Sequence, residues 1–125
     1  MKSKFFIPPI LLAAAIMITS CNKETQPPAT STPFAYTSLK SQSDTIFVGE
    51  TTTVTATATG SNLAYNWELT TNPQGGGSLG DIIGNGATVT YGASPCCTGW
   101  NTITCTVSDG LNSQSKSVTI VVREQ

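Results

Sequence analysis

Two adjacent cysteines are the side chains in this sequence with the most distinctive chemistry. Cys96 and Cys97 follow Ser94-Pro95 in a turn-rich segment, and Cys105 lies further along. A disulfide between neighbours is conceivable, although their Cα atoms are only about 3.8 Å apart where about 5.5 Å is usual. A bond to Cys105 would require the segment to fold back along its own strand, and a metal site of three thiolates without histidine is the least favoured arrangement. We expect a Cys96–Cys97 disulfide and no metal site, with the pairing to Cys105 left open.

Catalytic constellations are missing from the sequence. There is no histidine among the 125 residues, so the abundant serines and threonines lack the usual general base, and no Cys-His pair can form. The carboxylates show no spacing typical of glycosidases, and the glycines at 75–77 are not followed by the Lys-Ser/Thr of a phosphate loop. We therefore expect no enzyme and no cofactor.

Trp100 and the glycine-rich segment 72–86 are the other candidates for binding. Trp100 follows the cysteine pair and, together with segment 72–86, is the first candidate for a ligand-contact surface, while a residue that caps the core is the alternative for Trp100. Segment 72–86 holds six of the eleven glycines, which favours a mobile or binding loop or, equally, a slack connection. Asp109 is expected to accept backbone N–H bonds in a tight turn rather than to bind calcium.

The first 20 residues have the layout of a secretory signal. Lys2 and Lys4 precede an apolar run over 5–18, which is interrupted by Pro8 and Pro9 and ends in the small-residue stretch Ile18-Thr19-Ser20. The run is shorter than the roughly 20 apolar residues that a membrane-spanning helix needs. An ordinary cleaved signal and an uncleaved helix are the alternatives that we weigh.

The end of this segment, Ile18-Thr19-Ser20-Cys21, resembles the lipobox of bacterial lipoproteins. The resemblance implies cleavage before Cys21, which would become the first residue and carry a diacylglycerol on its sulfur and acyl chains of the palmitate type. Two or three chains anchor a protein stably, because each buried methylene contributes about 0.8 kcal/mol. Since Asn22 is not the aspartate associated with inner-membrane retention, the resemblance favours the outer membrane of the cell envelope.

Charge and length limit the partners of the remaining chain. Without residues 1–20, four basic residues stand against seven acidic ones, a net charge of −3. No basic stripe is available for phosphates, so nucleic acid is not expected as a partner. Residues 21–37 are rich in proline and threonine and are expected to form a flexible linker, and residues 38–125 are enough for one small domain.

The elements that must position these side chains are strands. From Phe34 onward, apolar residues alternate with Thr, Ser or Asn, and turn signals such as Gly60-Ser61-Asn62 separate the runs. Trp67 shares a row with Leu63, Tyr65 and Leu69, so we expect it to be a core anchor between two sheets. The expected strands span 34–39, 44–48, 51–59, 63–70, 79–83, 87–92, 101–108 and 115–123. Short alternating strands of this kind predict an all-β, antiparallel two-sheet β-sandwich.

Several segments, taken in order, resemble the PKD-type and related bacterial immunoglobulin-like domains. They are Val48-Gly49-Glu50-Thr51, Leu63-x-Tyr65-x-Trp67, Ala87-Thr88-Val89-Thr90-Tyr91 and Val107-Ser108-Asp109-Gly110. The resemblance covers roughly residues 38–123, although Trp67 is followed by Glu68-Leu69-Thr70 where PKD domains have Asp-Phe-Gly-Asp-Gly. It implies an immunoglobulin-like sandwich, and in many such domains a cysteine at the place of Cys105 pairs across the core with one on the second strand. Here the second strand offers Val54, Ala56 and Ala58 instead, so we expect Cys105 to be a buried thiol.

Domains of this type serve as adhesion modules, partner-binding modules or spacers. The expected function is therefore that of a lipid-anchored envelope protein that presents one immunoglobulin-like module to an envelope or host protein or to a glycan. The alternative is a structural spacer or a subunit of an envelope assembly without a ligand of its own.

Overall fold

The segments in which apolar and polar residues alternate form β-strands in the part of the chain that the structure describes. The structure is a computed structural model that describes residues 31–71 and 80–125. The signal segment 1–20, Cys21 and most of the expected linker lie outside this part. The eight expected strands are all present within a few residues of their expected bounds. They are β1 (Ala35–Ser41), β2 (Thr45–Phe47), β3 (Thr51–Thr59), β4 (Ala64–Thr71), β5 (Gly80–Ile83), β6 (Thr88–Ala93), β7 (Gly99–Ser108) and β8 (Ser113–Arg123).

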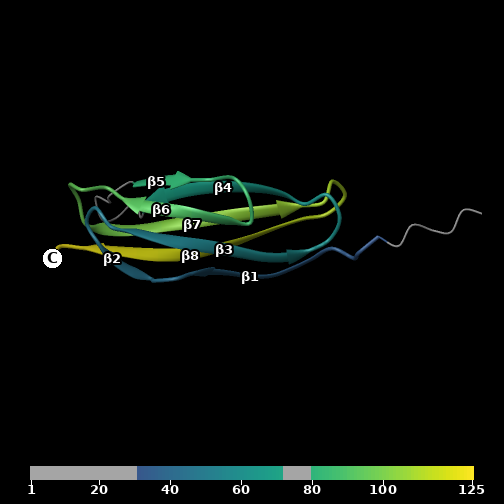
Figure 1. Cartoon of the computed structure of the whole chain (residues 1–125), viewed down its shortest axis with the longest axis horizontal. Helices are drawn as coiled ribbons and strands as arrows, with labels where there is room; N and C mark the ends of the chain where they lie inside the picture. The colour runs from purple at the N-terminus through teal and green to yellow at the C-terminus, as the bar shows by residue number, and fades with distance from the viewer. Residues whose placement is uncertain (1–30, 72–79) are drawn as a thin grey trace, which may run out of the picture. The chain divides into compact units, whose positions relative to one another are not determined.

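These strands form two four-stranded sheets (Figure 1). One has the order β1-β3-β6-β5 and the other the order β2-β8-β7-β4. This arrangement corresponds to the two sheets of an immunoglobulin-like sandwich, in which the first, second, fifth and fourth main strands form one layer and the third, sixth and seventh form the other. The predicted all-β, immunoglobulin-like sandwich is confirmed.

One strand pair departs from the antiparallel arrangement that we expected. β2 runs parallel to β8, with Thr45 opposite Val121 and Phe47 opposite Arg123. The chain leaves β1 at the edge of one sheet and continues in β2 at the edge of the other, without reversing its direction. Because alternation of side chains reports which face is buried and not the direction of a neighbouring strand, the sequence pattern could not show this pairing.

The core lies between the two inward rows of side chains. The row of β7 contributes Ile103, Cys105 and Val107, each without exposed surface, and the facing row of β3 contributes Val54 and Ala56. The intervening threonines of both strands point outward, as the period of two requires.

The expected role of Trp67 is confirmed: its ring packs against both halves of the core, and its Nε1 donates to the carbonyl oxygen of Gly86 at 2.9 Å. Trp67 thereby ties β4 to the turn before β6 in the other sheet.

The first strand begins earlier than the domain boundary expected at residue 38. β1 starts at Ala35, and its ladder with β3 has a register shift between Tyr36 and Ser38. Tyr36 is buried beneath this irregularity, and the ammonium group of Lys116 lies 5.5 Å from the centre of its ring. Apolar contact of Tyr36 with the core explains why the strand includes residues that the proline-rich composition assigned to the linker.

The chain enters and leaves the sandwich at opposite ends (Figure 1). Ala35 pairs with Thr59 at the end that also holds the β7–β8 turn, whereas Gly99 pairs with Val122 at the other end, near Gln125. In the described residues, no helix has the length and apolar character needed to cross a membrane. The end that holds the C-terminus also holds the β6–β7 loop, and this end carries the candidate site.

Candidate binding groove

Trp100 stands on the outer face of the β2-β8-β7-β4 sheet. It lies opposite Val121 of β8, which in turn lies opposite Thr45 of β2. Its neighbour Asn101 points inward and is fully buried, so alternation turns the indole of Trp100 towards solvent, where it is 55% exposed. This exposure does not fit the alternative of a residue that caps the core.

A groove of about 440 Å³ opens beside Trp100. The groove is shallow and largely open to solvent. Because Thr98 precedes Gly99, which pairs with Val122, the threonine comes next to Arg123 on the neighbouring strand. The start of β7, the end of β8 and one residue adjoining each strand supply the lining, which consists of Thr98, Gly99, Trp100, Val121, Val122, Arg123 and Glu124.

The charged groups of the groove are Arg123 and Glu124, both exposed at the end of β8. Within residues 31–71 and 80–125, neither of them takes part in an ion pair or a side-chain hydrogen bond. A guanidinium group only donates hydrogen bonds and a carboxylate only accepts them, so the groove offers both kinds of partner to a ligand. The sequence alone does not single out Arg123 and Glu124, because their place beside Trp100 depends on the β7–β8 register. Val121 lies opposite Trp100, so the outward position two residues further along β8 is the signal that would have found Arg123.

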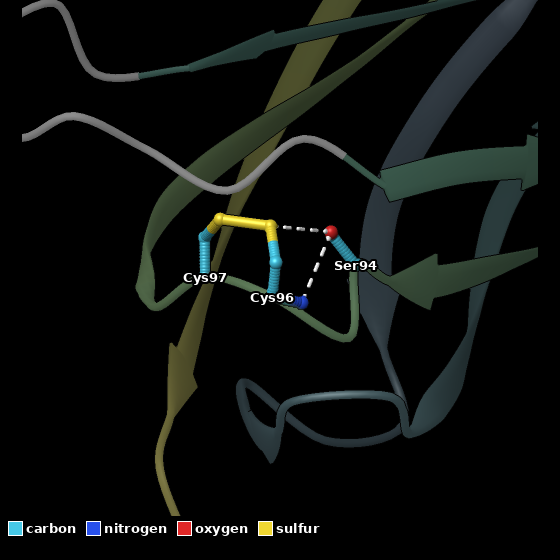
Figure 2. The surroundings of a disulfide bond; sticks show 3 residues. All are labelled: Ser94, Cys96 and Cys97. Carbon is cyan, nitrogen blue, oxygen red and sulfur yellow. Dashed lines mark hydrogen bonds between the residues drawn. A yellow bond between two sulfur atoms is a disulfide. The ribbon is translucent and has the colours of Figure 1, made fainter.

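The cysteine pair lies in the β6–β7 loop, directly before Thr98. In the structure the sulfurs of Cys96 and Cys97 are bonded at 2.02 Å, with the Cα atoms 3.7 Å apart (Figure 2). Ser94 closes the turn: its Oγ accepts a hydrogen bond from the Cys96 amide at 3.4 Å and lies 3.1 Å from the Cys96 sulfur. Since a disulfide sulfur carries no proton, the hydroxyl is the donor in the second contact.

Cys105 is remote from this loop chemistry. It is a free thiol without exposed surface and packs with Tyr36 and Val107 in the core. Burial raises the pKa of the Cys105 thiol, and burial together with the adjacent thiol raises the pKa of Tyr36. A thiol in this setting behaves as a small apolar side chain.

The remaining sequence candidates lie elsewhere. Asp109 closes the β7–β8 turn, where its Oδ1 accepts the amides of Leu111 and Asn112 at 2.9 and 2.7 Å, which confirms its expected role. In the described part, no three His, Cys, Asp or Glu side chains gather at a metal-binding spacing. Of segment 72–86, residues 72–79 lie outside the described part. The rest forms β5 and the following turn in the other sheet and does not line the groove.

Comparisons with known proteins add little to this geometry. The sequence matches no protein-family model, and no curated protein matches it. Among solved structures, the chain is similar to a chimeric titin Z1Z2 functionalized with a KLER exogenous peptide from decorin. The identity is 11%, the match covers 73% of this chain and 99% of that chain, and the TM-score is 0.40. The assignment of the fold depends on the strand order described above.

Proposed function

We propose that this protein is a lipoprotein of the cell envelope, anchored in the outer membrane through Cys21, that presents one immunoglobulin-like module to a protein or a glycan. The signal-like segment 1–20, the lipobox-like end at Cys21 and the proline-rich linker support the anchor. PKD-type domains, which the sequence resembles, commonly serve as such modules.

The observation that carries the binding part of the proposal is the position of the Trp100 groove. An exposed indole in a groove is the kind of amphipathic surface that is enriched in binding sites. The groove lies at the end of the sandwich opposite Ala35, where the chain arrives from the anchor (Figure 1). A module held by its first strand therefore presents the groove away from its point of attachment.

One observation favours a spacer as the second candidate. Because the chain enters at one end and leaves at the other, the module adds its full length to anything joined to it. β3 alone, with nine residues, measures about 30 Å at ~3.3 Å per residue. A spacer would have a fixed neighbour and would not need Trp100.

The anchor is tested by changing Cys21 to serine in the full-length chain. We expect the wild type in the membrane fraction and the variant in the soluble envelope fraction, because a hydroxyl cannot be lipidated by the thioether chemistry. A variant that stays wholly in the membrane fraction would rule out anchoring through Cys21. Protease treatment of whole cells would then distinguish a surface-exposed from a periplasmic domain.

Binding is tested by photo-crosslinking in intact cells. A photoreactive residue at position 98 is expected to capture a partner, either protein or glycan, and the capture should disappear with Trp100→Ala. The matched control is the same residue at position 111, where Leu111 is 94% exposed at the opposite end. Capture of a fixed neighbour that is indifferent to Trp100→Ala would favour the spacer.

A further inference from the structure

We infer that the Trp100 groove binds an uncharged oligosaccharide of at least two sugar units. This inference rests on the proposed binding function and names the ligand class for the same site. Four features support this ligand class: the ring of Trp100, the charged pair Arg123 and Glu124, the second ring of Phe47, and the bonded loop beside the groove.

The stacking surface is the indole of Trp100. It is held on a strand by the ladder with β8 and presents 55% of its surface to solvent. The face of an aromatic ring carries partial negative charge, so it attracts the positively polarised C–H bonds that line one face of a pyranose ring. Val121, opposite Trp100, extends this apolar surface across the groove.

The two charged groups of the groove have opposite signs, so together they offer hydrogen-bond donors and acceptors without a net charge. Arg123 offers donors and Glu124 offers acceptors, and in the described chain the two are not paired with each other or with another side chain. A carboxylate ligand would be attracted by Arg123 and repelled by Glu124, and an amine ligand the reverse, so neither gains a net electrostatic advantage over a neutral ligand. A sugar hydroxyl donates and accepts at once, so neighbouring hydroxyls satisfy both residues and the Thr98 hydroxyl without a net charge.

A second aromatic ring sets the minimum length of the ligand. Phe47 lies opposite Arg123 on β2 and is 40% exposed. Alternation with the buried Ile46 turns it to the same outer face as Trp100. Two strand spacings and a two-residue offset separate the two positions by about 10–12 Å. That separation exceeds the width of one sugar ring, so a ligand that contacts both rings has at least two units.

The loop beside the groove reduces the cost of binding. The bonded pair Cys96–Cys97 and the Ser94 contacts restrict the residues that lead into Thr98. A group that is already ordered loses less conformational freedom when a ligand arrives.

The test is a titration of the full-length protein with defined oligosaccharides, monitored by calorimetry and, in a Trp67→Phe background, by the fluorescence of Trp100. The probes are a neutral hexose and its oligomers of two to six units, an oligogalacturonate and a chitosan oligomer of matched length, and an unrelated zwitterionic peptide. We expect binding of a neutral oligomer that strengthens from one to two units. Trp100→Ala and Arg123→Ala should each weaken this binding about tenfold or more. Phe47→Ala should weaken the binding of oligomers of two or more units and leave that of the single hexose unchanged. Leu111→Ala, a matched exposed apolar side chain at the other end, should leave the affinity unchanged.

Tighter binding of the acidic, basic or peptide probe than of every neutral oligomer would overturn the inference, as would neutral binding that is indifferent to Trp100→Ala. An absence of binding to all neutral oligomers would also overturn it. The crosslinking experiment then separates the two levels: a protein captured at position 98 in a Trp100-dependent manner would leave the proposed binding function standing. Failure of both experiments would remove both.

Discussion

The carboxylate of Asp109 is the side chain that most plainly controls a local conformation in this domain. It accepts the amides of Asn112 and Leu111, and these bonds, the Asn112 bond first, hold the pKa of the carboxyl below its usual range. Gly110, between Asp109 and Leu111, has a φ of 95°, which favours glycine. The turn therefore depends on a charged acceptor and a glycine in adjacent positions.

Asp109→Asn is expected to lower the unfolding midpoint at pH 7, because a neutral amide oxygen accepts these bonds less strongly. The pKa of Asp109 is lower in the folded than in the unfolded chain. Its stabilising effect is therefore complete above the unfolded pKa of about 3.9 and is lost as the pH falls through the folded value. Urea unfolding of both proteins from pH 7 down to pH 2 should show the midpoints converging at the acid end. The exposed Asp81→Asn serves as control, and a constant difference over the whole range would contradict the explanation.

The three cysteines of the domain are expected to respond differently to alkylation. No lysine or arginine stands between Lys40 and Lys116, so one tryptic peptide contains Cys96, Cys97 and Cys105. The native protein should take up no iodoacetamide there, because Cys105 is fully buried and the other two are bonded. After unfolding without reductant the peptide should carry one carbamidomethyl group, and after unfolding with reductant it should carry three in total. Three groups without reductant would show that the pair is not a disulfide.

At the scale of elements, the contact between β5 and β6 depends on a glycine without space for a side chain. A Cβ at Gly80 would lie 1.9 Å from the carbonyl oxygen of Gly92, whereas a Cβ at Gly86 would meet nothing within 4 Å. Gly80→Ala should therefore separate the start of β5 from β6 and lower the unfolding midpoint, while Gly86→Ala should be tolerated. Amide exchange of β5 would show the separation directly, and equal effects of the two variants would argue against this pairing.

The two sheets are joined by Trp67 as well as by the core. Trp67→Phe removes the hydrogen bond to Gly86 and part of the ring, so we expect a loss of about 1–2 kcal/mol in the free energy of unfolding. Denaturant unfolding measures this loss. Tyr65→Phe in the same row is the control, since it removes a hydroxyl and leaves the ring. An unchanged stability of Trp67→Phe would mean that the link to the β6 turn does not contribute.

Alternation predicted the strands well because burial of one face is written in every second residue. The row Ile103, Cys105 and Val107 is an example, and it is fully buried as expected. Three features depend on how strands meet rather than on their composition. The parallel β2–β8 pair, the bulge at Tyr36 and the position of Arg123 beside Trp100 all follow from inter-strand register. Trp100 was found from its residue type, but its groove needed that register.

Asn101 shows a second limit of pattern reading. It lies in an inward row and is fully buried, and in the described chain its side-chain amide has no hydrogen-bond partner. Leaving such a group unpaired costs about 1–3 kcal/mol. Its polar side chain would suggest the outer face, whereas the alternation that buries Ile103, Cys105 and Val107 places it in the inward row.

At the largest scale that the structure describes, the first strand of the sandwich starts at one end and the groove lies at the other. The described strands place Ala35 beside Thr59 and Gly99 beside Val122, about one strand length apart. With an anchor before residue 22, the linker can add up to a few nanometres at about 3.3 Å per extended residue. The Trp100 groove would then be held off the bilayer surface, where a ligand outside the membrane can bind to it.

This arrangement predicts how Trp100 responds to quenchers when the lipidated protein is placed in liposomes. In a Trp67→Phe background, Trp100 is the one remaining tryptophan of the two in the sequence. Its 55% exposure predicts strong quenching by acrylamide in the aqueous phase. Brominated acyl chains should not quench it, because they act at contact and the groove lies at the end remote from Ala35.

The Cys21→Ser protein, mixed with the same liposomes, provides the reference without an anchor. Quenching of the anchored protein by brominated lipid would mean that the groove end rests on the membrane, and presentation of the groove to an external ligand would have to be abandoned.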